Sequence, residues 1–183
     1  MNLIIKPLTP NLTSDYLDFF DHRAFSDNNP CGPCFCTSPS MDAASEQQMV
    51  REFGQDVKGT VRRYAVNLLA QGKIHGYLAF DGTLSIGWCN AGPMDGYVRW
   101  IPDSARHHTC GKTVSVVCFA IAPEYRGQGV AGALLTRVCA DAQAAGFAAV
   151  EGYAQVQKDR VSYDYHGPLR LFAQAGFVAV ARV

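Results

Sequence analysis

The sequence predicts an α/β fold in which helices flank a mixed central sheet. Two strand-like runs flank an Asp-Gly turn at residues 81–83, which predicts an antiparallel hairpin. A strand, a helix and a second strand follow one another over residues 113–153, which predicts two parallel strands with a right-handed crossover. Helical periodicity over residues 12–69 supplies helices that can cover the sheet.

Length and composition favour one domain over residues 1–183. The 183 residues are 48% hydrophobic and 17% charged, enough for one ordinary core but hardly two. The formal net charge is zero and Lys and Arg form no run, so we expect neither a nucleic-acid nor a membrane partner. No signal peptide or membrane span is recognisable. Seven cysteines are an odd number, which argues against a disulfide framework and favours the cytoplasm.

The first half of the chain is predicted to be mainly helical after one short strand. Residues 3–8 are expected to form an edge strand, and residues 12–25 carry apolar side chains at helical spacing. A second helical stripe extends from about residue 45 to residue 69, but Gly54 and Gly59 weaken it. We therefore predict either one broken helix or two short ones.

The middle of the chain is predicted to form strands. The hairpin joins residues 77–80 to residues 84–89, and residues 92–111 are loop-like. Residues 113–121 form a nearly continuous apolar and β-branched run, which predicts a strand that is covered on both faces.

The last third alternates helices and strands. Apolar side chains on one face predict a helix over residues 131–142, which Gly146 ends. Residues 148–153 return as a strand, a short helix extends from residue 167 to residue 175, and residues 177–183 are expected to form a last strand.

The loop before the helix at residue 131 has the composition of a phosphate site. Gly127 and Gly129 leave backbone N–H groups at a helix N-terminus accessible to an anion, which a side chain there would keep away. Arg126 adds a cation that can pair with a phosphate oxygen. A glycine-rich turn without a ligand is the simpler alternative.

The same loop also matches the dinucleotide-binding fingerprint, with Glu151 near the position of the ribose-binding acid. Residues 123–126 separate the strand from the first glycine, however, and too little chain follows Glu151 for the remaining strands. A dinucleotide site is therefore disfavoured.

Residues 121–135, Ile-Ala-Pro-Glu-Tyr-Arg-Gly-Gln-Gly-Val-Ala-Gly-Ala-Leu-Leu, closely resemble the acetyl-CoA signature of the GCN5-related N-acetyltransferase (GNAT) family. The family pattern is Gln/Arg-x-x-Gly-x-Gly/Ala, and Arg126, Gly129 and Ala131 fill its fixed positions. Residues 169–177 resemble the short helix and Gly-Phe turn that close the family's core. The resemblance extends to the order of elements and implies the GNAT fold, whose central strands splay apart.

The resemblance implies an acetyltransferase that uses acetyl-CoA as its co-substrate. In the family, acetyl-CoA lies between the two splayed strands, here residues 113–122 and 148–153. Backbone groups of Phe119, Ala120 and Ile121 are then expected to face the pantetheine and the acetyl carbonyl, and an N–H there would act as an oxyanion hole does. The pyrophosphate is expected to contact Arg126, Gly127, Gln128, Gly129, Val130, Ala131 and Gly132.

Direct attack by an amine requires a base, because a free alkylamine has a pKa of about 10. Glu151 is our candidate, since some family members carry a catalytic glutamate at this place on the second strand. A glutamate with a purely structural role is the alternative. His107 and His108 are weaker candidates, because paired histidines in a polar loop are usually solvated.

The family often uses a tyrosine to reprotonate the thiolate, but Phe172 stands at that position. Tyr165 is our candidate replacement, with Tyr163, His166 and water as alternatives. Without catalysis, the chain would bind acetyl-CoA and not turn it over, which is our second hypothesis.

The acceptor is expected to be a small amine or a peptide. Trp88 and Asn90, at the end of the hairpin, are expected to border its pocket, although Trp88 fits a core position equally well. The family usually ends in two strands and only one fits after residue 177, so we also consider a homodimer that completes the pocket.

Residues 31–34, Cys-Gly-Pro-Cys, reproduce the thioredoxin redox motif. The motif requires a preceding strand and a following helix, and neither is predicted here. Cys31, Cys34 and Cys36 could also assemble a zinc site with Cys89, Cys110 or the histidines at 107 and 108, but a single cluster without a matching second pair is weak evidence. We therefore expect an acceptor-side loop without a metal, and a redox or zinc module is the third hypothesis.

Overall fold

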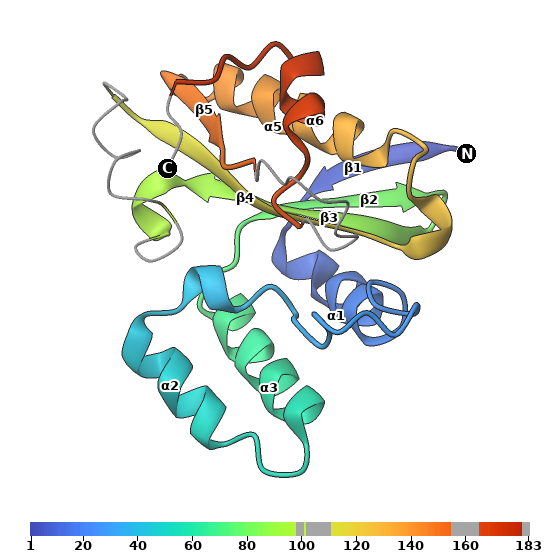
Figure 1. Ribbon diagram of the computed structural model, residues 1–183, viewed down its shortest axis with the longest axis vertical. Coiled ribbons are helices and arrows are strands. Elements are labelled where there is room, and N and C mark those ends of the chain that lie inside the picture. The colour runs from blue at the N-terminus through green and yellow to red at the C-terminus, as the bar shows by residue number, and fades with distance from the viewer. Residues whose placement is uncertain (98–100, 102–110, 155–164, 181–183) are drawn as a thin grey trace.

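The protein is built around a five-stranded sheet with helices on both faces (Figure 1). The computed structural model describes residues 1–97, 101, 111–154 and 165–180. The strands follow the order β1-β2-β3-β4-β5, with the first four antiparallel and β5 parallel to β4. They are β1 (Leu3–Pro7), β2 (Gly76–Asp81), β3 (Leu84–Pro93), β4 (Thr113–Ile121) and β5 (Ala149–Gly152). The predicted mixed sheet is confirmed.

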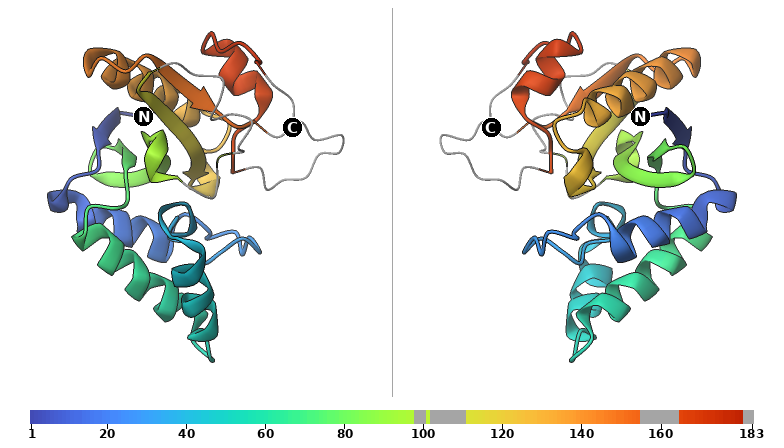
Figure 2. Two further views of the ribbon diagram at one scale, coloured as in Figure 1. Left: turned by 90° about the vertical axis from the view of Figure 1, so that its left-hand side faces the viewer. Right: turned by 90° about the vertical axis from the view of Figure 1, so that its right-hand side faces the viewer.

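The helices form two layers, which Figure 2 shows from both sides. One layer contains α1 (Thr13–His22), α2 (Ala43–Arg51) and α3 (Val57–Ala70). The other layer contains α5 (Val130–Ala144) and α6 (Leu169–Gln174). Each layer buries its own apolar cluster against the sheet. Within the described ranges, no helix combines the length and apolar character that a membrane span needs.

The helical stripe predicted over residues 45–69 is two helices rather than one broken helix. Asp42 accepts a hydrogen bond from the Ser45 N–H and begins α2, and Asp56 accepts one from the Gly59 N–H and begins α3. Gly54 lies between them with a φ of 49°, a conformation that glycine adopts more easily than other residues. Local capping therefore explains the division.

The two parallel strands pair over only part of their length. β5 pairs with residues 113–116 of β4, whereas residues 117–121 extend past the end of β5. A bulge coincides with the separation, because Asn90 and Ala91 of β3 are paired with Cys118 and Val116, which leaves Val117 as an extra residue. We call residues 117–121 of β4, beyond the end of β5 at Gly152, the β4–β5 fork. The splayed central strands are thus confirmed.

The predicted last strand over residues 177–183 is wrong for its described part. Residues 177–180 form no strand, and residues 181–183 lie outside the described residues. Val178 and Val180 are 81% and 73% exposed, so the described part of the chain does not cover this apolar run. Phe177 instead packs its ring on Phe172, with centroids 5.3 Å apart, and its N–H closes the end of α6 on the Phe172 carbonyl.

Candidate functional site

The β4–β5 fork exposes the backbone of β4 to a segment that precedes α6. The Phe119 N–H donates to the Tyr165 carbonyl oxygen at 2.6 Å, so this amide points away from β3 and toward the space that β5 leaves. Phe119 and Ala120 have buried side chains that pack on opposite faces of the sheet, and Ile121 is half-buried. These three side chains serve the core, which leaves the backbone as the group that a ligand can use.

The glycine-rich loop joins the fork to α5. Gly127 and Gly129 have φ angles of 75° and 83°, and a Cβ added at either would meet no atom within 4 Å. Gly129 is the N-cap of α5, with no side-chain cap and no acidic residue in the first turn. Open space beside both glycines and an uncapped helix start are the features that an anion site requires.

The other predicted cofactor residues have different surroundings. Val130 is buried in the core, and Ala131 and Gly132 are half-buried on the first turn of α5. The exposed Gln128 side chain turns back, and its Nε2 donates to the Glu124 carbonyl at 2.7 Å. Only the backbone of these residues is suited to contact a phosphate.

Arg126 is engaged by two groups. Its Nη1 lies 2.5 Å from Asp27 Oδ2, and its Nε donates to the Ile121 carbonyl at 3.1 Å. The hydrogen bond from Arg126 lowers the pKa of Asp27 below its usual value. The Arg126 side chain remains 39% exposed. Asp27 lies in the loop between α1 and α2, residues 23–42, which we call the α1–α2 loop.

Glu151 lies in a hydrogen-bonded chain beside the paired part of β4. The Tyr153 hydroxyl donates to Glu151 Oε2 at 3.0 Å and lies 3.1 Å from Ser115 Oγ. Ser115 is fully buried and pairs with Glu151 across the two strands. An ionised carboxylate only accepts, so the chain runs from Ser115 through Tyr153 to Glu151.

The hydrogen-bonded side chains of Ser115, Tyr153 and Glu151 lie on the α1 side of the sheet. Tyr153 and Cys118 pack against one small cluster of Tyr97, Ile101 and Val117. Cys118 also packs against the cluster under α1. Glu151, whose side chain is on the same face as that of Tyr153, is therefore directed to the side of the α1–α2 loop.

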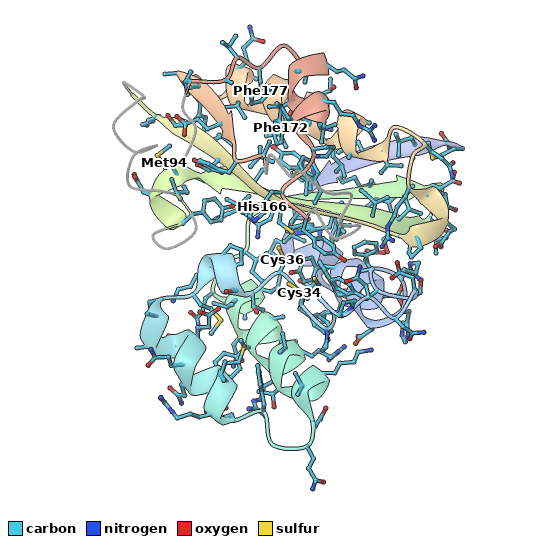
Figure 3. The ribbon with its side chains drawn as sticks, viewed as in Figure 1. Cys34, Cys36, Met94, His166, Phe172 and Phe177 are labelled. Carbon is cyan, nitrogen blue, oxygen red and sulfur yellow. The ribbon has the colours of Figure 1, made fainter. Side chains whose placement is uncertain are left out.

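Tyr165 lies between the fork and the α1–α2 loop. Its ring contacts the Phe25 ring with centroids 5.8 Å apart, and its buried hydroxyl has no hydrogen-bond partner in the described part of the chain. Burial raises the pKa of Tyr165 well above its usual value. In the view of Figure 3, His166 lies between Phe172 on the α5 side and Cys36 on the α1 side. Tyr163, His107 and His108 lie outside the described residues.

Trp88 and Asn90 are both completely buried. Trp88 packs edge-on against Tyr16 at 4.9 Å, which makes its side chain part of the core under α1. Asn90 donates from Nδ2 to Cys36 Sγ at 3.2 Å and accepts from the Tyr97 hydroxyl at 2.6 Å. Asn90 therefore connects β3 to the α1–α2 loop.

The cysteine motif does not have the surroundings of a redox site. Cys31 is exposed, Cys34 is half-buried and Cys36 is buried. A hydrogen bond with Cys36, together with burial, raises the pKa of Cys34 well above its usual value, whereas a redox thiol needs a lowered one. Among the residues that the structure describes, no group of three or more His, Cys, Asp or Glu side chains is arranged to hold a metal.

A pocket of about 440 Å³ lies on the outer side of the α1–α2 loop. It is lined mainly by residues at the end of α1 and in the loop, together with Lys58 of α3. Phe25 lines this pocket and also contacts Tyr165, whose carbonyl accepts the Phe119 N–H of the fork.

Four polar residues of the site were missed by the sequence analysis. Tyr153 could have been predicted from the sequence, because residues two apart on a strand share a face and Glu151 was already a candidate. Ser115, Tyr97 and Asp27 carried no such signal. Asp27 and Arg126 are 99 residues apart, and only the folded chain brings them together.

Comparisons with known proteins identify the family and support the fold. The model of the acetyltransferase (GNAT) family matches residues 38–177. No curated protein matches the sequence. A solved aminoglycoside acetyltransferase from an uncultured soil metagenomic sample is 12% identical, with a TM-score of 0.55, over 100% of this chain and 92% of that one.

Two further solved structures share the fold. The GCN5-related N-acetyltransferase from Ralstonia eutropha is 17% identical, with a TM-score of 0.53, over 99% of this chain and 95% of that one. A predicted acetyltransferase from Clostridium acetobutylicum, solved with acetyl-CoA, is 13% identical, with a TM-score of 0.50, over 97% of this chain and 91% of that one. Because the family model matches more than half of the sequence, the chain belongs to the GNAT family and is an acetyltransferase.

Proposed function

We propose that the chain is a single N-acetyltransferase domain that transfers an acetyl group from acetyl-CoA to a primary amine by direct attack. The observation that carries this proposal is the glycine loop at the start of α5. Gly127 and Gly129 hold left-handed backbone conformations beside open space, at an uncapped helix N-terminus that directly follows the β4–β5 fork. An anionic diphosphate is the ligand that such a helix start favours.

Acetyl-CoA fits the residues that are present. Backbone N–H groups of residues 127–132 would hold its diphosphate, with Arg126 as the neighbouring cation. The backbone of Phe119, Ala120 and Ile121 would bind the acyl-carrying arm along the fork, where the Tyr165 carbonyl, which now accepts the Phe119 N–H, would have to give way to it. When bound, acetyl-CoA supplies the thioester whose carbonyl carbon accepts the amine.

Glu151 is proposed to take the proton of the attacking amine, directly or through water. Within the described residues, Oε2 accepts the Tyr153 hydroxyl and Oε1 accepts no hydrogen bond. Tyr153 and Ser115 would hold the carboxylate in one orientation while Oε1 receives the proton. Tyr153 is thus a positioning residue for the proposed base.

Tyr165 is proposed to return a proton to the departing thiolate. A tyrosine hydroxyl is protonated at neutral pH, as an acid must be, whereas burial raises the pKa of Tyr165 and makes it a weaker proton donor. Phe172 lacks a hydroxyl and is buried against Phe119 and Phe177, so it has no part in proton transfer. The presence of Phe172 where the family often has a tyrosine favours one alternative, an acetyl-CoA-binding protein without turnover.

Calorimetric titration of acetyl-CoA tests the proposed binding. The Gly129→Glu variant places a carboxylate at the helix start, so acetyl-CoA binding should fall at least about tenfold. Gly72→Glu is the matched control, because Gly72 also has a positive φ, 64°, and open space around it, but lies in the turn after α3. No binding by the unchanged protein, or equal binding by Gly129→Glu, would overturn the proposed site.

Turnover distinguishes the enzyme from the non-catalytic alternative. Release of the CoA thiol should be followed with a panel of amines that includes aminoglycosides, since the solved soil-sample protein is an aminoglycoside acetyltransferase. Peptides with free N-termini belong in the same panel. Acetyl-CoA binding without thiol release across the panel would favour the non-catalytic alternative.

A further inference from the structure

The signature arginine is paired with a carboxylate that lies far away in the sequence. Arg126 Nη1 is 2.5 Å from Asp27 Oδ2, and the Nε of the same guanidinium donates to the Ile121 carbonyl in the fork. These two bonds orient the guanidinium between the α1–α2 loop and the glycine loop. Because Arg carries five donors, its remaining N–H groups stay available to a phosphate.

Two residues earlier, the α1–α2 loop also contacts Tyr165, whose backbone is bonded to the fork. Phe25 packs its ring on Tyr165, and the Tyr165 carbonyl accepts the Phe119 N–H. Asp27 and Phe25 therefore hold the loop against Arg126 and Tyr165, two residues beside the region where acetyl-CoA is proposed to bind. The ion pair is not an isolated surface contact.

We propose that Asp27 is a positioning residue that orients Arg126 and competes with the diphosphate of acetyl-CoA for its charge. This inference rests on the proposed function. The Asp27 carboxylate and a bound diphosphate would share one guanidinium, and two anions that share one cation repel each other. Acetyl-CoA affinity is thus held below the value that Arg126 alone would give, and cofactor binding weakens the contact of the α1–α2 loop.

The Asp27→Asn variant separates the two contributions. Asparagine keeps an oxygen that accepts from Arg126 but removes the negative charge, so acetyl-CoA should bind about three- to fivefold more tightly, the size that a partly exposed charge pair permits. Asp27→Glu keeps the charge and should retain the affinity of the unchanged protein. S-acetylpantetheine has no diphosphate, and its binding should be the same in all three proteins.

Asp141→Asn is the matched control. Asp141 pairs with Arg137 at 2.8 Å at the other end of α5, about 18 Å from the glycine loop at 1.5 Å per helical residue. Its loss should leave acetyl-CoA affinity unchanged, and circular dichroism should confirm that every variant is folded.

The outcomes are distinguishable. Failure of the unchanged protein to bind acetyl-CoA overturns the proposed function. Binding by the unchanged protein with equal affinity in Asp27→Asn overturns only this inference. Weaker binding of both acetyl-CoA and S-acetylpantetheine by Asp27→Asn would also overturn it, because Asp27 would then have a structural role alone.

Discussion

At the scale of single residues, the site depends on side chains whose partners are distant in the sequence. Glu151 owes its orientation to Tyr153, and Tyr153 is held by Ser115 on the neighbouring strand. Asn90 connects the Cys36 thiol to the Tyr97 hydroxyl. Charge and hydrogen-bond direction lead to two predictions at this scale, one for Glu151 and one for Tyr16.

Replacing Glu151 should impair catalysis and not cofactor binding. Glu151→Gln removes the proposed base, so kcat should fall about 10²- to 10⁴-fold while the acetyl-CoA Kd stays the same. Tyr153→Phe keeps the Glu151 carboxylate but removes its hydrogen-bond donor, so its kcat should lie between that of Glu151→Gln and that of the unchanged protein. Steady-state kinetics and calorimetry provide these values. Glu52→Gln, which changes a carboxylate that pairs with Arg63, is the control, and a kcat of Glu151→Gln like that of this control would exclude the role of base.

Tyr16 should make stability sensitive to alkaline pH. Burial raises its pKa well above the usual value, and its hydroxyl donates to the Phe35 carbonyl at 2.5 Å. At pH 7, Tyr16→Phe should lower the free energy of unfolding by about 1–3 kcal/mol, because the carbonyl loses its partner. A raised folded-state pKa contributes stability below the unfolded pKa of about 10 that is lost above it.

The difference between Tyr16→Phe and the unchanged protein should therefore shrink as the pH rises above about 10. Urea unfolding at pH 7 and at pH 10.5 measures it. A difference that is independent of pH would show that Tyr16 ionises equally in the folded and unfolded states.

At the scale of elements, the separation of β4 from β5 shapes the site. The bulge at Val117 coincides with the end of pairing, and α6 covers β5 from the α5 side. Gly152, the last residue of β5, is where strand and helix meet most closely. A Cβ there would lie 2.0 Å from Phe172 Cε1.

Gly152→Ala should therefore destabilise the protein by about 1–3 kcal/mol, because the added methyl group overlaps the Phe172 ring. Gly96→Ala is the matched control, since a Cβ at Gly96 meets no atom within 4 Å. Chemical denaturation measures both. The contact between β5 and α6 would be looser than described if the two variants were equally stable.

At the scale of the whole molecule, the two helical layers have different tasks. The α5 layer supplies the glycine loop and closes the core behind the fork. The α1 layer supplies Asp27, Phe25 and the cysteine loop, which face the fork from the other side. The proposed acetyl-CoA site therefore lies where the two layers meet across β4.

The sequence by itself determined the order of elements, the hairpin, the buried strand at residues 113–121 and the glycine loop before α5. Each of these features follows from a local sequence pattern: a run of β-branched residues, helical spacing of apolar residues, an Asp-Gly turn or glycines at a helix start. The division of residues 43–70 into two helices was left open by periodicity and decided by the caps at Asp42 and Asp56.

Only the tertiary structure decided which side chains meet. The pairing of Arg126 with Asp27, the placement of Tyr153 beside Ser115 and the burial of Trp88 join segments that no local pattern connects. The strand expected after residue 177 is absent over residues 177–180, where Val178 and Val180 are exposed and the backbone pairs with no strand of the described sheet. Local propensity determines which helices and strands form, whereas packing between segments distant in the sequence determines which side chains meet.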